Sequence, residues 1–333
     1  MESSKVEVSV IIPVRNEHNY IVGCLESVTL QDYPQDKMEV IFIDGASEDD
    51  TAEIIKGYMG KFNNIRLLDN PNKFLQYALN IGIKSACGEY IVRMDAHSKY
   101  ANDYVSSCIK YLKKTGAHNV GGPTVVRGKG GLQSVIASAY HSKFAMGGGN
   151  NHRTNYEGLS DTVFLGSFKK SDIEKIGCYD ERFIRNEDDD LSFTMIENGM
   201  KIFITPNIKS VYYPRSSYKD LFKQYFEYGM WKVAVIKKHG KPARISHIIP
   251  LMFVLFLVLF GIGSLFSKPI AVIFAVMMSL YVILDMIFSF KNEGVSKISD
   301  KFRLMLVHFI IHTAYGLGFL VGIVKFRNFN TTQ

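Results

Sequence analysis

The C-terminal third of the chain holds three long apolar runs, and these limit the possible folds more than any other feature. Each run has about twenty residues, and the three runs are residues 245–267, 269–290 and 304–324. Apart from three histidines, the only acidic or basic side chain in them is Asp285. A helix of about twenty residues crosses the roughly 30 Å of hydrocarbon in a bilayer. We therefore predict a membrane anchor over residues 245–333, with three transmembrane helices at about 246–267, 269–290 and 304–324.

Basic residues beside these runs predict their orientation. Two groups of four lie before the first run and between the second and third: Lys237, Lys238, Lys241 and Arg244, then Lys291, Lys297, Lys301 and Arg303. Only Lys268 separates the first run from the second. The positive-inside rule then places residues 1–244 in the cytoplasm, at the cell (inner) membrane, with the C-terminal tail outside. Two features favour other arrangements: Lys325 and Arg327 in the tail, and Asp285, whose cost in lipid would suit a shallow hairpin arm.

The composition excludes several broad classes of protein. With 47% hydrophobic and 21% charged residues, the chain is neither disordered nor a small disulfide-bonded domain. Its four cysteines show no C-x-x-C spacing, and the polar residues 1–8 lack the apolar segment of a signal peptide. The net charge is +7, and basic residues cluster beside the apolar runs. We therefore expect membrane lipid, and not nucleic acid, as the anionic partner.

The first two hundred residues alternate short buried strands with amphipathic helices. Strands are expected at residues 8–13, 39–44, 65–68, 90–94, 119–126, 162–168 and 201–205. Helices are expected at residues 18–31, 50–62, 73–86, 132–144, 188–198 and 218–238. This alternation predicts an α/β fold with a mostly parallel sheet and helices on both faces.

Polar residues follow the buried strands at the edge where such sheets bind ligands. Asp44 follows the second strand, and Asp95 with His97 follows the fourth. Neither G-x-G-x-x-G nor G-x-x-x-x-G-K-[ST] is present, so the dinucleotide dehydrogenase and P-loop classes lack their main support. A carboxylate with a second donor two residues on suits Mn²⁺ or Mg²⁺ held together with a substrate diphosphate. We therefore interpret this acidic cluster as a site for metal-bound diphosphate chemistry.

A second acidic group, the stretch NEDDDL at residues 186–191, stands at the predicted start of a helix. Adjacent carboxylates repel one another unless a cation or a helix N-terminus stabilises them. A carboxylate at this place could act as general base toward a hydroxyl group. It could equally be a solvated first helical turn, and the two interpretations are compatible.

Four stretches in order resemble glycosyltransferase family 2 over about residues 6–213: VSVIIPVRNE, VIFIDGASEDDT, NIGIKSACGEYIVRMDAH and FIRNEDDDLSF. The stretches GGGNNHR, DTVFLGSFKK, YYPR and QYFEYGMWK resemble more closely the ExoA-like succinoglycan glucosyltransferases of exopolysaccharide synthesis. This resemblance implies the GT-A fold of nucleotide-diphospho-sugar transferases and a membrane-anchored C-terminal part. The resemblance also implies that the transferred group is a sugar, which the acidic residues alone do not indicate.

The resemblance assigns nucleotide-binding roles to the first two strand ends. Pro13, Asn16 and Glu17 match the family's P-x-x-N-E, which lines the base and ribose. Asp44 matches the first acid of D-D-G-S and should contact the uracil or ribose. Gly45 stands where the family has its second acid, so one nucleotide contact is in doubt.

The resemblance also implies the metal site and the catalytic base. Asp95 matches the first acid of the D-x-D metal motif, whereas His97 replaces the last. An imidazole can ligate Mn²⁺ but suits Mg²⁺ less well. Asp188 matches the catalytic base of the E-D motif, with Glu187 beside it, and Asp190 matches the following acid in a helix-start or orienting role.

The stretch QYFEYGMW at residues 224–231 is similar to the Q-x-x-R-W motif of processive polysaccharide synthases but departs from it. Glu227 stands where that motif has arginine, which favours the addition of a single sugar. Gln224 and Trp231, together with Asp190, are candidate acceptor-side residues, and for Trp231 the physical basis is that aromatic rings stack on apolar sugar faces. The alternative is a helix face that packs on the protein or lies at the lipid surface.

Small and polar residues in the third apolar run predict close helix contacts. Gly318-x-x-x-Gly322 favours tight helix packing, within the chain or in a homo-oligomer. His308 and His312 lie four apart on one helical face and are expected to pack against a neighbouring helix.

We thus expect a catalytic domain at residues 1–214, an interfacial segment at 215–244 and the anchor at 245–333. The expected function is transfer of one sugar, with inversion, from a UDP-sugar to a polyprenyl-diphosphate-linked saccharide. The alternatives are a polyprenyl-phosphate sugar synthase, a processive synthase and, outside the enzymes, a scaffold of a polysaccharide export complex.

Overall fold

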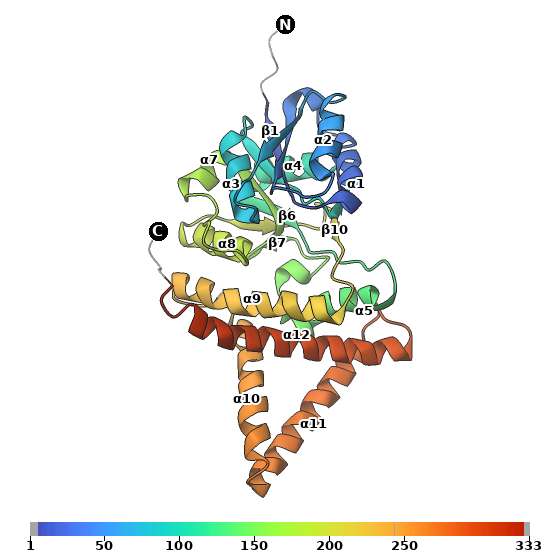
Figure 1. Cartoon of the computed structure of the whole chain (residues 1–333), viewed down its shortest axis with the longest axis vertical. Helices are drawn as coiled ribbons and strands as arrows, with labels where there is room; N and C mark the ends of the chain where they lie inside the picture. The colour runs from blue at the N-terminus through green and yellow to red at the C-terminus, as the bar shows by residue number, and fades with distance from the viewer. Residues whose placement is uncertain (1–5, 243, 330–333) are drawn as a thin grey trace. The chain divides into compact units, whose positions relative to one another are not determined.

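A computed structural model describes residues 6–242 and 244–329 (Figure 1). The chain forms two compact units that alternate along the sequence. The first unit contains Met1–Val125 and Arg153–Tyr212, and the second contains Val126–His152 and Tyr213–Gln333. Each unit is built from its own secondary structure and is described separately.

The first unit is built on an eight-stranded sheet with the strand order β3-β2-β1-β4-β8-β6-β9-β7. Its strands are β1 (Val8–Val14), β2 (Met38–Asp44), β3 (Ile65–Asp69), β4 (Tyr90–Arg93), β6 (Asn119–Gly122), β7 (Gly158–Leu159), β8 (Phe164–Lys169) and β9 (Ile202–Ile204). The neighbours from β3 to β4 pair in parallel, whereas β8 runs antiparallel to both β4 and β6. The predicted α/β fold with a mostly parallel sheet is therefore confirmed.

Helices cover both faces of this sheet. They are α1 (His18–Thr29), α2 (Thr51–Met59), α3 (Leu75–Ser85), α4 (Tyr104–Thr115), α7 (Lys170–Lys175) and α8 (Glu187–Glu197), with a short 3₁₀ turn at Gln35–Lys37. Val10 and Ile12 face the core under α1, α2 and α4, while the intervening Ile11 faces the core under α3, α7 and α8. Because successive strand residues point to opposite faces, a strand buried on both sides reads as an unbroken apolar run.

Three short strands and two helices, α4 and α7, were not predicted from the sequence. Strands β5 (Ser98–Tyr100) and β10 (Ser210–Tyr212) pair antiparallel in a separate ribbon, and β7 has only two residues. Helix α4 ends at Gly116, whose φ of +62° suits a left-handed helix cap. The short strands depend on long-range pairing, which local apolar periodicity does not reveal, whereas α4 has the helical spacing of buried residues and was overlooked.

The second unit is entirely helical. Its helices are α5 (Gly131–Tyr140), α6 (Lys143–Met146), α9 (Tyr218–His239), α10 (Ile249–Gly263), α11 (Lys268–Phe290) and α12 (Ile298–Lys325), with 3₁₀ turns at Asn150–His152 and Ile245–His247. Three segments are long and apolar enough to cross a membrane: Ile245–Gly263, Lys268–Phe290 and Ile298–Lys325. The first two bury little of their surface inside the protein, whereas α12 is half-buried along most of its length.

Glycines bring α12 against α9, and the two helices run in the same direction (Figure 1). A Cβ atom on Gly318 would overlap the carbonyl oxygen of Phe226, and one on Gly322 would overlap that of Met230. The predicted close packing at Gly318-x-x-x-Gly322 is therefore confirmed as a contact within the chain. His308 also packs as expected, since its Nδ1 lies 2.6 Å from Asp285 Oδ1 on α11.

The compact units divide the chain at other places than the expected domains do. Residues 126–152 were expected inside a domain running unbroken to residue 214, but they belong to the helical unit. The physical reason is packing: Asn292 Nδ2 donates to the carbonyl oxygen of Ser138 at 3.2 Å, and the Phe144 ring stacks on Phe288 at 5.4 Å. The segment between β6 and β7 thus forms part of the core of the helical unit.

Candidate active site

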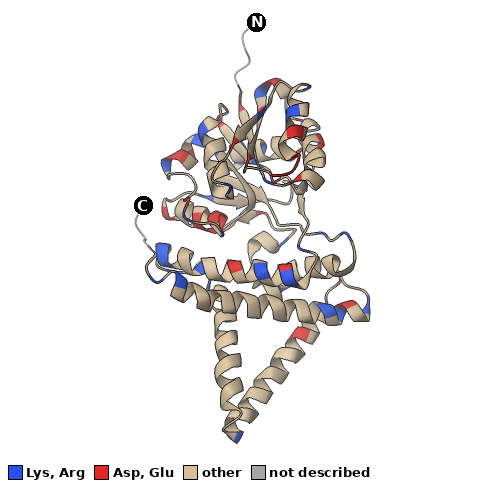
Figure 2. Ribbon diagram, viewed as in Figure 1, with Lys and Arg blue, Asp and Glu red and all other residues tan. Residues whose placement is uncertain are grey.

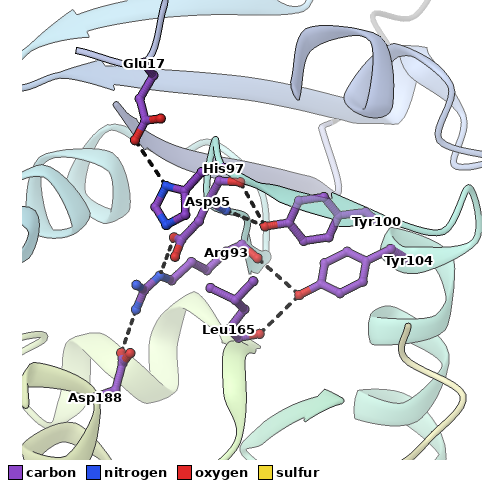
Figure 3. Close-up of polar contacts among 8 residues, drawn as sticks. All are labelled: Glu17, Arg93, Asp95, His97, Tyr100, Tyr104, Leu165 and Asp188. Carbon is purple, nitrogen blue, oxygen red and sulfur yellow. Dashed lines mark hydrogen bonds and ion pairs between the residues drawn. The ribbon is translucent and has the colours of Figure 1, made fainter. Parts of the chain in front are cut away.

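The strand order brings three loops of the first unit to one edge of the sheet. Because β1 lies between β2 and β4 and is parallel to both, the residues after these strands become neighbours. Glu17 follows β1 and His97 follows β4, and Glu17 Oε1 lies 3.1 Å from His97 Nδ1 (Figure 3). Two residues eighty positions apart in the sequence therefore share one polar cluster.

The loop after β1 is tied to the loop after β2. Asn16 adopts a left-handed backbone with φ of +55°, which asparagine tolerates better than most residues. Its N–H donates to Ser47 Oγ at 2.9 Å, and its Oδ1 accepts the N–H of Glu48 at 2.8 Å. The N–H of Glu17 donates to Thr51 Oγ1 at 2.9 Å, at the first residue of α2. These bonds give the predicted nucleotide-binding residues a shared rigid frame.

Asp44 ends β2 and is buried. Its carboxylate accepts the N–H of Ser47 at 3.1 Å and the Ser47 hydroxyl at 2.5 Å. The next residue, Gly45, is tightly surrounded. A Cβ atom there would lie 3.0 Å from the carbonyl oxygen of Lys73 and 3.3 Å from the Arg15 side chain. A side chain at this position would therefore require its neighbours to shift by a few tenths of an ångström.

Arg93 connects the two acidic groups that the sequence predicts separately (Figure 3). The Arg93 side chain lies at the end of β4 and is 4% exposed. Its Nε donates to Asp95 Oδ1 at 3.2 Å, and its Nη1 donates to Asp188 Oδ1 at 2.6 Å. A buried guanidinium needs carboxylate partners because burying an unpaired charge is costly. One cation therefore holds the predicted metal ligand and the predicted base side by side.

Two tyrosines fix the backbone of this segment. Tyr100 hydroxyl accepts the N–H of Asp95 at 2.5 Å and lies 3.1 Å from the Asp95 carbonyl oxygen. Tyr104 is fully buried, and its hydroxyl lies within 3.3 Å of the carbonyl oxygens of Arg93 and Leu165. Since both rings are packed edge to face with centroids 4.7 Å apart, the Arg93–Asp95 backbone has little freedom.

The second acidic group stands at the start of α8, as the sequence predicts. Asn186 precedes the helix with φ of +61°, and the first helical turn holds Glu187, Asp188, Asp189 and Asp190. Asp188 remains partly exposed, but loss of surrounding water raises its pKa; Arg93 opposes this rise, and the carboxylates of Asp95 and Asp189 add to it. Burial also raises the pKa of Glu187, and the neighbouring Asp188 adds to that rise.

Asp190 differs from the acids before it because it is 2% exposed. Its N–H donates to the carbonyl oxygen of Asn186 at 2.9 Å, and its own carbonyl accepts the Thr194 hydroxyl at 3.0 Å. An inward-facing acid at the helix start suits the expected orienting role.

Gln224 and Trp231 lie on α9 in the helical unit, away from these loops in the sequence. Both are buried there. The Trp231 ring packs on Phe326 with centroids 4.7 Å apart, and Gln224 Nε2 donates to the Tyr228 hydroxyl at 3.0 Å. These contacts agree with the packing interpretation of this helix, and the acceptor-side role of both residues stays a prediction.

Sequence reasoning overlooked Arg93, although one signal was present. The strand YIVR is otherwise apolar and is buried on both faces. A basic residue at the end of such a strand must find acidic partners within the fold. That partner is supplied by α8, which begins 94 residues further along the chain.

Two glycan-synthesis proteins are similar to this chain in sequence. A transferase of Methanococcus voltae is 29% identical over 329 residues, covering 96% of this chain and 97% of that protein. It is described as a dolichyl N-acetyl-alpha-D-glucosaminyl phosphate 3-beta-D-2,3-diacetamido-2,3-dideoxy-beta-D-glucuronosyltransferase. The succinoglycan biosynthesis protein ExoA of Rhizobium meliloti is 30% identical over 245 residues, covering 73% of this chain and 74% of ExoA.

A solved structure confirms the expected GT-A fold. The mannosyltransferase PcManGT of Pyrobaculum calidifontis, in complex with GDP-Man and Mn²⁺, superposes with a TM-score of 0.60 at 18% identity. The match covers 95% of this chain and 88% of PcManGT. The family model described as "Glycosyl transferase family 2" matches residues 9–177, which include the loops after β1, β2 and β4. The chain therefore belongs to glycosyltransferase family 2 and is a glycosyltransferase.

Proposed function

We propose that this protein transfers a single sugar, with inversion, from a UDP-sugar to a lipid-linked saccharide in cell-surface glycan synthesis. The observation that carries the proposal is the pair of bonds made by Arg93, which holds Asp95 and Asp188 at 3.2 Å and 2.6 Å. A transferase needs a group that binds the diphosphate and a base that activates the acceptor within reach of one sugar. Arg93 supports such an arrangement by tying the candidate for each role to one side chain.

In the proposed mechanism Asp188 acts as general base. Its carboxylate takes the proton of the acceptor hydroxyl while that oxygen attacks the anomeric carbon from the face opposite the nucleotide. The bond between the anomeric carbon and the diphosphate oxygen breaks in the same displacement, and UDP departs. Arg93 orients the Asp188 carboxylate, and placing base and donor in fixed positions lowers the entropic part of the barrier.

Asp95 and His97 are the candidates to hold a divalent metal ion. Among the described residues no three His, Cys, Asp or Glu side chains form a metal-binding group, so the diphosphate would have to complete the coordination. A carboxylate with an imidazole suits Mn²⁺ better than Mg²⁺. When bound there, the ion would offset negative charge on the departing diphosphate.

The acceptor assignment rests on the relatives and on the apolar helices. The M. voltae relative is named for a dolichyl-linked acceptor, and ExoA for succinoglycan biosynthesis. A multi-pass anchor in the cell membrane would keep the site near a polyprenyl-diphosphate-linked saccharide in the cytoplasmic leaflet. Glu227 in place of the arginine of Q-x-x-R-W supports addition of one sugar over processive synthesis.

The test compares Asp188→Asn with Asp189→Asn, the same chemical change one residue later. Membranes holding each variant are given UDP- or GDP-sugars and lipid extract, and the lipid product is measured by mass. Asp188→Asn should keep UDP binding but lose about 10²–10⁴-fold in transfer rate, because a base typically contributes that much. Asp189→Asn should transfer at nearly the normal rate. Unchanged turnover in Asp188→Asn would reject Asp188 as the base, and a polymeric product would favour the processive alternative.

A further inference from the structure

The third apolar helix, α12, is attached over its C-terminal half to α9, a helix that cannot lie in hydrocarbon. Gly318 contacts the α9 backbone at Phe226, and Gly322 contacts it at Met230. Further along both helices, Lys237 Nζ donates to the carbonyl oxygen of Phe326 at 2.7 Å. The paired positions advance together in both helices, so α9 and α12 are parallel neighbours. Whatever tilt one helix takes in a membrane, the other must share.

Helix α9 carries charges along its length, which rules out a transmembrane position for it. The charged residues are Lys219, Asp220, Lys223, Glu227, Lys232, Lys237 and Lys238. Figure 2 shows them along α9, whereas α10 and α11 are almost without charge between their ends. Charged side chains within a bilayer are costly unless they line a polar interior. A helix of this kind lies at the membrane surface instead.

Six exposed apolar side chains of α12 form a stripe along one side of the helix, and residues such as Ile298, Arg303 and Ile323 are exposed beside it. Its members are 36% to 77% exposed and are Phe302, Leu306, Phe309, Leu317, Val321 and Val324. They recur mainly at steps of three and four residues, which places them on one side of a helix. The opposite side holds buried residues such as Leu304, Ile311 and Ala314. A helix with one exposed apolar side and one side covered by protein suits the boundary between lipid and water.

The hairpin of α10 and α11 leaves α12 from the side of this stripe. A Cβ atom on Gly316 would overlap the carbonyl oxygen of Pro250 in the first turn of α10. Phe309, a member of the stripe, lies with its ring 6.3 Å from Phe253 on α10 and 6.4 Å from Tyr281 on α11. Figure 1 shows both helices projecting from α12 on the side opposite α9. The hairpin and the stripe therefore face the same medium.

The charges at the ends of the hairpin agree with this arrangement. Lys268 is the one basic residue at the turn between α10 and α11. Groups of basic residues flank the other two ends, before α10 and after α11. Lys325 and Arg327 add two more basic residues at the end of α12. The positive-inside rule thus places both ends of the hairpin and the end of α12 on the same, cytoplasmic side of the membrane.

We propose that α10 and α11 enter the bilayer as a hairpin, while α12 lies in the membrane plane beneath α9 with its apolar stripe in lipid. The partner of this surface is the lipid bilayer itself. Residues 326–329 then lie on the same side of the membrane as the first unit, which holds the candidate active site and is called the catalytic unit below. The three-span arrangement would place them on the opposite side. The inference requires membrane association but not the catalytic assignment of Asp188.

The first test measures depth. Trp231, the single tryptophan, is replaced by phenylalanine, and one tryptophan is introduced at Leu306, Leu317 or Val324 in the full chain. Each variant is placed in vesicles with lipids brominated at several acyl positions. An in-plane α12 predicts the same depth at all three sites, near the headgroups. A spanning α12 predicts that Leu306 and Leu317 differ by about 16 Å along the helix axis, with Leu317 deep in the acyl region. That pattern would overturn the proposal.

The second test measures sidedness. Asn328 is exposed after α12 and is changed to cysteine, while native Cys87 is exposed in the catalytic unit and serves as the internal control. Cells are treated with a membrane-impermeant maleimide before or after permeabilisation, and labelled peptides are read by mass. Equal behaviour of Asn328→Cys and Cys87 supports the proposal, and opposite behaviour overturns it. Labelling of Cys87 in intact cells would instead reject the cytoplasmic location proposed for the catalytic unit.

Discussion

At the residue scale, Arg93 does more than fill a place in the core. Its side chain is 4% exposed, and its guanidinium is paired with two acids from different elements. Asp95 belongs to the segment after β4, and Asp188 to the first turn of α8. Because guanidinium groups present several donors in a fixed plane, one arginine can hold two carboxylates at a set distance. The relative position of the two acidic groups thus depends on a residue that is in neither motif.

Removing this cation should alter the pH dependence of the enzyme. In Arg93→Met, Asp188 loses the group that lowers its pKa, so its pKa should rise. Asp188 must be deprotonated to act as base, and the acid limb of the profile of kcat/KM against pH should therefore move to higher pH. We also expect kcat at neutral pH to fall by about 10²-fold, because the base is misplaced.

Arg66→Met is a suitable control for this change. Arg66 also forms an ion pair, with Glu39 at 2.7 Å, but on the β2–β3 side of the sheet and with its own side chain 40% exposed. The Arg66→Met variant should leave the profile of kcat/KM against pH unchanged. An unshifted profile in Arg93→Met, with the fold intact by thermal unfolding, would contradict the orienting role of Arg93.

His97 should set the preference for metal ions. His97→Asp restores the carboxylate of the D-x-D pattern, and carboxylates suit Mg²⁺ better than imidazole does. The ratio of activity with Mg²⁺ to activity with Mn²⁺ should therefore rise severalfold. His97→Ala removes the donor altogether and should lower activity with both ions. If His97→Asp and His97→Ala gave the same ratio as the original protein, His97 would not be a ligand.

At the scale of elements, buried polar pairs connect the apolar helices. Asp285 of α11 lies 2.6 Å from His308 of α12, and Ser289 donates to the same carboxylate oxygen at 3.1 Å. Asp285 and His308 are both buried. His312 on the next turn of α12 lies 2.9 Å from the carbonyl oxygen of Phe144, which joins α6 to the same group. The polar residues of the apolar runs thus set which helices are neighbours.

Removing one member of the Asp285–His308 pair should lower the free energy of unfolding more than replacing both members. Asp285→Leu leaves His308 buried without its carboxylate, which should lower the free energy of unfolding by about 3 kcal/mol. The double change Asp285→Leu with His308→Leu replaces both polar groups and should recover most of that loss. Unfolding in mixed micelles measures both values. A double variant as unstable as the single one would indicate that the pair does not act as a unit.

At the scale of the whole molecule, the two units are interleaved in sequence. The chain leaves the sheet after Val125, builds α5 and α6 in the helical unit, and returns to the sheet at Arg153. Val135, Ile136 and Tyr140 of α5 are buried in this position. The catalytic unit is therefore joined to the helical unit by three crossings of the chain, so neither unit corresponds to one continuous piece of sequence.

A chain ending at Pro214 should consequently be poorly soluble. It keeps α5 and α6 but lacks α9 and the three helices that follow, so apolar side chains would be exposed. Replacing residues 126–152 by a flexible Gly/Ser linker of about 12 residues, which spans roughly 20 Å, removes those side chains. The linked form should remain monomeric in sedimentation while the simple truncation aggregates. Equal solubility of the two would mean that the 126–152 segment does not depend on the helical unit.

Elements with a local pattern could be predicted from the sequence. Runs such as VSVIIPV identify strands buried on both faces, and three long apolar runs identify apolar helices, because burial selects side chains residue by residue. The ordered motifs also determined the family and the order of the candidate site residues. Tertiary structure alone decided the pairing of Arg93 with Asp188, the place of residues 126–152, and the attachment of α12 to α9. These depend on contacts between segments far apart in the chain, for which hydrophobic periodicity specifies a face but not its partner.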